Sequence, residues 1–290
     1  MTGLAFAIFA FLFGAVVGSF LNVCIYRLPR GESLVYPPSH CPKCYQPIRS
    51  DDNIPIVSWF LLGGRCRFCH ERISPIYPIV EFLTGALFFL YYWRLLGLEE
   101  PPSAGMLAVY TVHVAFLSAL IAVTVIDLRH YLVPDEISLP GTAAALAASF
   151  VLPALQPSSW SPSHPHLSSL GASAVGAAVG AAVIYGIGAL GKAIIPKERL
   201  AFGGEAMGLG DVKLMAMIGA MLGWEATILV IFASALLGTV YGVIRMSFTG
   251  DNKIPYGPFL AIAAAAMLVF RPAVTSFVAD VVASYRFLIR

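Results

Sequence analysis

Long apolar runs alternate with short polar stretches along almost the whole chain. A helix that crosses a bilayer needs about 20 apolar residues. The first run meets that length and is followed at once by Arg27 and Arg30. It is too long for a signal-peptide core and no basic residue precedes it, so we predict a retained first span. The eight predicted spans are residues 3–26, 76–98, 104–126, 136–155, 168–194, 212–223, 225–245 and 257–271.

Composition supports an all-α polytopic membrane protein. Of the 290 residues, 58% are hydrophobic and 12% are charged, whereas soluble proteins carry about 25% charged residues. A net charge of +2 gives no reason to expect a nucleic acid as partner. The tail, residues 273–290, can be an interfacial amphipathic helix or a further span.

Small residues mark the fifth apolar run. Six glycines, mixed with alanines, predict close packing of this helix against a neighbour. Simple tolerance of small residues in lipid is the alternative. The glycines are Gly171, Gly176, Gly180, Gly186, Gly188 and Gly191.

Basic residues gather on one side of the predicted membrane. Seven of the 18 Lys and Arg lie between the first and second spans, in residues 27–75. Counting the crossings places seven more on that side. Cytoplasmic loops carry the excess of Lys and Arg, so the polar loop 27–75 is predicted to be cytoplasmic.

Two CxxC pairs lie in this loop, with 21 residues between Cys44 and Cys66. In a reducing cytoplasm four such thiols favour a metal over disulfides. The loop has few apolar residues, so a structural Zn²⁺ held by tetrahedral thiolates would supply stability that a core cannot. A redox or catalytic thiol site is the alternative. Cys24, inside the first run, is expected to be a small apolar core residue. The predicted zinc ligands are Cys41, Cys44, Cys66 and Cys69.

Two acids lie at membrane boundaries on that same side. Asp127 ends the third apolar run and Asp211 opens the sixth, with two crossings between them. If they meet in a low-dielectric site, one carboxylate ionises and the other stays protonated, which is the pair an aspartic protease uses. Alternatively, Asp127 pairs with Arg129 and Asp211 is a helix N-cap. Asp135 is explained by capping alone.

The motifs together resemble the bacterial type IV prepilin peptidases, bifunctional leader peptidase/N-methyltransferases of the GxGD intramembrane aspartyl protease class. The resemblance covers nearly the whole chain, and it also includes Asp127. Its motifs are Gly18-Ser-Phe-Leu-Asn22-Val-Cys-Ile-Tyr-Arg27-Leu-Pro, Pro38-Ser-His-Cys41, Asp52-Asn-Ile-Pro-Ile-Val-Ser-Trp59, Gly64-Arg-Cys66, Tyr77-Pro-Ile-Val-Glu81, Leu132-Val-Pro134-Asp135 and Gly208-x-Gly-Asp211-Val-Lys213-Leu.

The resemblance implies a multi-pass enzyme of the bacterial inner membrane whose zinc loop and active site face the cytoplasm. It implies cleavage of the basic leader of prepilins and pseudopilins by Asp127 and Asp211, and then methylation of the new N-terminus with S-adenosylmethionine. Glu81, Asn22 and Glu205 are candidates for the methyltransferase site. The implied organisation is a first helix (1–26), a zinc-binding domain (27–75) and a membrane-embedded peptidase domain (76–290).

Two other functions stay open from the residues. A proton-coupled transporter would use the acid pair as a relay, although the halves show no evident inverted repeat. A peptidase that lacks methylation is the other. Leader cleavage separates the first from the transporter, and the mass of the mature pilin N-terminus separates the two peptidases.

Overall fold

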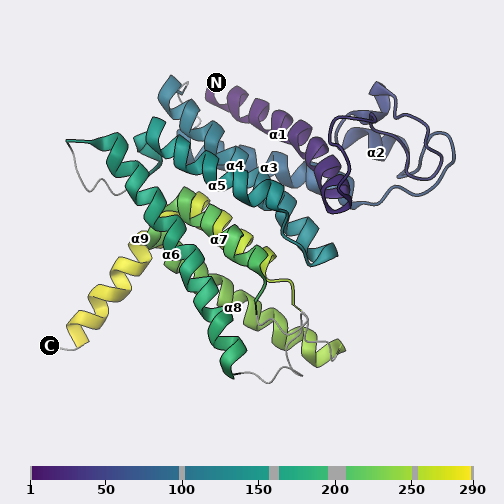
Figure 1. Ribbon diagram of the computed structural model, residues 1–290. Coiled ribbons are helices and arrows are strands. Elements are labelled where there is room, and N and C mark those ends of the chain that lie inside the picture. The colour runs from purple at the N-terminus through teal and green to yellow at the C-terminus, as the bar shows by residue number, and fades with distance from the viewer. Residues whose placement is uncertain (1, 98–101, 157–162, 195–206, 250–253, 289–290) are drawn as a thin grey trace. The chain divides into compact units, whose positions relative to one another are not determined.

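Helices and two isolated β-bridges are the regular structure of the described residues, 2–97, 102–156, 163–194, 207–249 and 254–288 of a computed structural model. It forms two compact units, Met1–Ala144 and Ala145–Arg290 (Figure 1). The α-helices are α1 (Thr2–Arg27), α2 (Val57–Leu61), α3 (Ile76–Leu96), α4 (Ala104–His130), α5 (Asp135–Val151), α6 (Pro165–Ile194), α7 (Leu209–Leu222), α8 (Trp224–Thr249) and α9 (Gly257–Leu288).

Five of the described helices, α1, α3, α4, α6 and α8, are long and apolar enough to cross a membrane. The predicted all-helical, multi-pass architecture is therefore confirmed. The other three predicted spans are also helical, but α5 and α7 have only 17 and 14 residues. The apolar part of α9, Gly257–Arg271, is short too. The count of eight spans is not confirmed.

Two helices run further than the apolar pattern predicts. α4 continues past residue 126 to His130, and it ends where Tyr131 adopts a left-handed conformation and donates its N–H to the Asp127 carbonyl at 2.9 Å. α9 continues through the predicted tail to Leu288, with a non-helical residue at Phe270. Polar residues at a span boundary did not end either helix.

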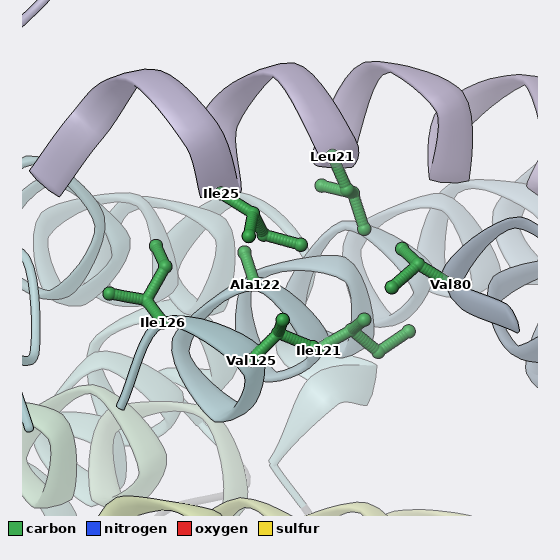
Figure 2. Close-up of a cluster of buried hydrophobic side chains, with 7 residues drawn as sticks. All are labelled: Leu21, Ile25, Val80, Ile121, Ala122, Val125 and Ile126. Atoms are coloured by element: carbon green, nitrogen blue, oxygen red, sulfur yellow. The ribbon is translucent and has the colours of Figure 1, made fainter. Parts of the chain in front are cut away.

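The core of the first unit is a cluster where α1, α3 and α4 meet. Figure 2 shows its side chains pointing toward one another from the three helices. Ile126, at the C-terminal end of α4, is 0% exposed. The cluster therefore fixes the end of α4 against the end of α1. Its members are Leu21, Ile25, Val80, Ile121, Ala122, Val125 and Ile126.

α1 and α3 pack almost backbone to backbone. A Cβ added at Gly18 would lie 2.7 Å from the Cα of Glu81, and one added at Gly85 would lie 2.8 Å from the carbonyl oxygen of Phe11. Only glycine allows this approach. The close contact lets Asn22 Nδ2 donate to the Tyr77 carbonyl at 3.0 Å.

In the second unit, α6 packs against α7 in the same manner. A Cβ at Gly176 would lie 2.1 Å from the carbonyl oxygen of Gly219, and one at Gly180 would lie 2.4 Å from that of Met215. The predicted close packing of the fifth apolar run is confirmed for these two glycines. Gly186, by contrast, faces open space.

Candidate functional site

The polar loop between α1 and α3 has no apolar core. From Leu28 to Pro75 only Ser58 and Gly64 are buried. The four predicted zinc ligands nevertheless come together, with all Sγ atoms within 4.8 Å of one another. The Sγ atoms of Cys41 and Cys69 are 3.8 Å apart, and those of Cys44 and Cys66 are 4.0 Å apart. Tetrahedral zinc with bonds of about 2.3 Å requires about 3.8 Å between sulfurs, so the donor set fits Zn²⁺.

The two CxxC pairs are built by the same backbone pattern, repeated 25 residues later. In each, the N–H of the first Cys donates to the carbonyl five residues on, and the residue after the second Cys donates back to the first. Each pair is closed by a β-bridge, His40↔Pro47 and Arg65↔Arg72. The residue after the second Cys, which is Tyr45 in one pair and His70 in the other, has a positive φ. The loop is therefore two equivalent knuckles whose four thiols form one candidate metal site.

An ion pair connects the second knuckle to Asp52. Arg67, between Cys66 and Cys69, donates from Nε to Asp52 Oδ2 at 2.7 Å and makes a second contact through its guanidinium. This pairing lowers the pKa of Asp52. The backbone N–H of Cys69 lowers the pKa of the Cys66 thiol to about 7, which favours the thiolate that binds metal.

Asp127 belongs to the last turns of α4. Its side chain is buried, with the residue only 5% exposed. It follows Ile126 of the apolar cluster, and Tyr131 caps its carbonyl. A carboxylate buried at a span end is costly and by default marks function. The structure therefore holds Asp127 at a rigid point of the first unit.

Asp211 lies in the first turn of α7, in the second unit. The N-cap of this helix is Gly208, not Asp211, and the Asp211 N–H donates to the Gly208 carbonyl at 3.1 Å. The interpretation of Asp211 as a simple N-cap is therefore wrong. The half-buried residue interacts electrostatically with Tyr256, whose hydroxyl lies 2.9 Å from Ser234 Oγ. Its helix is held in place by the glycine contact with α6.

Glu81 lies in the α1–α3 contact and is 8% exposed. Its Oε2 accepts the N–H of Ile56 at 2.6 Å. Ile56 has φ 65° and ψ −55°, and Val57 N–H donates to the Pro55 carbonyl at 2.6 Å, which together make a strained γ-turn. Glu81 thus holds the loop onto α3, one turn from the Asn22–Tyr77 hydrogen bond.

A shallow groove of about 470 Å³ opens beside this turn. Trp59, Gly64, Arg65 and Arg72 are among its lining residues. Trp59 Nε1 donates to the Ile73 carbonyl at 3.1 Å, and the ring covers Gly64, where a Cβ would lie 2.9 Å from it. Glu205, the remaining methyltransferase candidate, lies outside the described residues.

Three features escaped the sequence analysis. The knuckle repeat has a signal in the printed sequence, because Gln46 and Ile48 recur as Glu71 and Ile73 at the same offsets. The γ-turn at Ile56 has no such signal, since isoleucine rarely takes a positive φ. Tyr256 also carries no local motif that would point to Asp211.

Comparison with known proteins matches both parts of the chain. Residues 12–95 match the bacterial peptidase A24 N-terminal domain, and residues 114–243 match the type IV leader peptidase family. Among similar curated proteins are three prepilin leader peptidase/N-methyltransferases. That of Aeromonas salmonicida is 32% identical and that of Aeromonas hydrophila 34%, each covering 91% of both chains. That of Stutzerimonas stutzeri is 33% identical and covers 94% of this chain and 93% of its own. No solved structure matched.

The matched regions coincide with the features described above. The N-terminal match includes α1 from residue 12, the four-cysteine loop (the metal loop, residues 28–75) and α3 up to residue 95, and the second match includes both Asp127 and Asp211. Identity above 30% over nine-tenths of each chain leaves no large part of the protein outside the likeness. The chain belongs to the type IV leader peptidase family.

Proposed function

We propose that the chain cleaves the leader peptide of type IV prepilins and pseudopilins and then methylates the new N-terminus. The observation that carries the proposal is the family match over both acids, together with the burial of Asp127 at a span end. Asp127 comes from the first unit and Asp211 from the second. Cleavage requires the two carboxyl groups to converge on one peptide bond.

The chemistry follows from that convergence. One carboxylate is ionised and takes a proton from water, which attacks the scissile carbonyl. The other carboxyl is protonated and hydrogen-bonds to the carbonyl oxygen as charge develops there. A proton then passes to the leaving amine, and the C–N bond breaks. The products are the free leader carboxylate and the amino group of the mature pilin.

Two of the three methyltransferase candidates, Asn22 and Glu81, lie in the first unit. Bound S-adenosylmethionine would supply an electrophilic methyl group on its sulfonium; the deprotonated pilin amine would take the methyl, and S-adenosylhomocysteine would leave. A cationic donor needs a carboxylate near it, and Glu81 is a buried carboxylate at the end of α3 that faces the metal loop. Asn22 fixes the first turn of α3 beside it. Glu81 and Asn22 thus fit a site for a cationic ligand. Glu205 stays the third candidate.

Zinc has a structural role in this proposal. The four cysteines are all used as ligands, which leaves no open position for catalysis. The metal orders a loop that contains only two buried residues and so holds Ile56 against Glu81. The loop and both acids face the cytoplasm, which the distribution of Lys and Arg supports.

The test is a leader-cleavage assay on purified protein in detergent or nanodiscs. A leader-bearing prepilin is incubated with and without S-adenosylmethionine, and the products are identified by mass spectrometry. Cleavage in both samples, with one added methyl group only when the donor is present, supports both activities. Cleavage that never adds a methyl restricts the protein to a peptidase. Proton-driven flux in proteoliposomes without any cleavage would instead establish a transporter.

A further inference from the structure

The segment around α2, in the loop between α1 and α3 (Figure 1), has exposed apolar side chains and a buried polar side chain. Phe60 is 67% exposed and Leu61 is 78% exposed. Ser58 is 5% exposed, and its Oγ donates to the Asp51 carbonyl at 3.0 Å. This is the reverse of the pattern of a surface helix in water. We call the exposed side the apolar face of α2; its members are Ile54, Val57, Phe60 and Leu61.

Ile56, the residue before α2, lies beside α3 and not beyond its end. The hydrogen bond from Ile56 N–H reaches Glu81, which is five residues into α3, so it lies about 7.5 Å along that helix from Ile76. Glu81 in turn packs against Gly18 of α1, nine residues before Arg27, or about 13 Å from the end of that helix. The chain therefore folds back from the loop to a depth that two spans already occupy.

The groove next to α2 has the chemistry of a lipid headgroup site. Trp59 lines it, and tryptophan is enriched where hydrocarbon meets headgroups. Arg65 and Arg72 line it and are both exposed. Guanidinium groups bind phosphate through paired hydrogen bonds. Apolar side chains, a tryptophan and two arginines thus follow one another from the helix to the groove.

We propose that α2 is an interfacial anchor. Its apolar face inserts into the cytoplasmic leaflet, and Arg65 and Arg72 bind the phosphate of an anionic phospholipid of that leaflet. The continuity of this segment with α1 and α3 selects the bilayer as its partner, because the spans bring the surface to the membrane boundary. The proposal depends on the membrane spans and not on the reaction that the chain catalyses.

The test uses the full-length protein in nanodiscs of equal parts phosphatidylglycerol and phosphatidylcholine. Photoactivatable p-benzoylphenylalanine replaces Phe60 in one protein and Leu61 in another, and adducts are identified by mass spectrometry. Tyr45 is the matched control position, because it is 74% exposed but lies in the first knuckle beside His40. We expect lipid adducts at positions 60 and 61 at several times the yield at position 45.

The lipid class is tested by the ratio of phosphatidylglycerol adducts to phosphatidylcholine adducts at position 60. Each basic side chain at an anionic surface favours the anionic lipid about fivefold, so the ratio should strongly favour phosphatidylglycerol. The double variant Arg65→Gln with Arg72→Gln should bring it close to one, while the adducts themselves remain. Leader cleavage measured on the same samples reports the proposed function separately.

Three outcomes would overturn the inference. Equal yields of lipid adducts at positions 45 and 60 would show that α2 lies no deeper in the membrane than the first knuckle. A cross-linked dimer in place of lipid adducts would make the face an interface between two copies of the chain. An adduct ratio near one in the protein that keeps both arginines would show that Arg65 and Arg72 do not bind the anionic headgroup.

Discussion

The α1–α3 and α6–α7 contacts use the same device for different purposes. In both, glycine brings two helix backbones to a separation that no other residue permits. The contact in the first unit also buries Glu81 and Asn22, whose side chains hydrogen-bond across it or to the loop. The contact in the second unit is made by glycine against the carbonyls of Gly219 and Met215. The first contact thus positions polar side chains, and the second fixes α7, the helix whose first turn contains Asp211.

The largest effect is expected at the two proposed catalytic acids. Asp127→Asn or Asp211→Asn alone should slow leader cleavage by roughly 10²–10⁴-fold, since each removes one of the two proton-transfer groups. Cleavage rates of purified variants on a prepilin measure this. Asp135→Asn is the matched control, because that acid is in the first turn of α5 and should leave cleavage unchanged. Normal cleavage by either of the first two variants would defeat the proposed pair.

The next largest effect is expected at the metal loop of the first unit. Cys41→Ser with Cys44→Ser should release zinc and leave the loop open to proteases, because structural zinc contributes about 10–16 kcal/mol to the folding of small sites. Methylation should fall more than cleavage. Metal content by mass spectrometry and limited proteolysis give the readout. Cys24→Ser, on a buried Cys outside the site, should keep its zinc. One equivalent of zinc remaining in the double variant would show that the ligands are wrong.

Two glycines of one helix test the second contact. Gly176→Ala pushes a methyl group toward the Gly219 carbonyl and should cost about 1–3 kcal/mol through overpacking. Gly186→Ala meets open space and should be neutral or stabilising by up to about 1 kcal/mol, since alanine is the better helix former. Thermal unfolding in detergent, followed by intrinsic fluorescence, compares the two. Equal melting temperatures would contradict the close approach of α6 and α7.

Glu81→Gln, a change in the first unit, should separate methylation from cleavage. Glutamine can still accept the Ile56 N–H, but the negative charge is gone. Methylation should fall by about tenfold, as expected when a charge-assisted interaction becomes a neutral one. Cleavage should stay within twofold. The exposed acid Glu71 gives the control, Glu71→Gln, with both activities intact. Parallel loss of cleavage and methylation would instead make Glu81 a purely structural residue.

The smallest effect concerns the Asp52–Arg67 pair. Because Arg67 lowers the pKa of Asp52 in the folded loop, the pair stabilises the loop above the unfolded value of about 4. That stabilisation is lost as the pH falls through the lower folded pKa. Asp52→Asn should therefore weaken protease resistance of the loop at neutral pH and make less difference below about pH 4. Arg49→Gln, in the exposed pair with Asp51, is the control.

Hydrophobic length predicted where helices lie better than where they end. Each of the eight apolar runs lies mostly within a helix, because length and hydropathy are local properties. The end of α4 depends on the backbone of Tyr131, and the kink in α9 on Phe270, and neither conformation is visible as polarity. The span count failed to be confirmed for a similar reason, since a helix of 14 residues can be apolar without being long enough.

In the candidate site, too, some features were predictable from the sequence and others were not. The four cysteines were predictable from spacing, because thiolate chemistry limits what two CxxC pairs can do, and their Sγ atoms do converge. The partner of Glu81 was not predictable, since it is the backbone N–H of a residue 25 positions away in a conformation that isoleucine disfavours. Side-chain identity predicts ligands, whereas contacts between backbones depend on the completed fold.

The paired knuckles have a consequence for biosynthesis. All four thiols and both helices they connect are encoded before residue 97, ahead of every part of the second unit. A nascent chain released to that length by the ribosome holds what it needs to clamp its first two membrane segments into a hairpin. Metal supply during translation, and not only in the mature protein, would then decide whether later segments insert beside a correctly paired start.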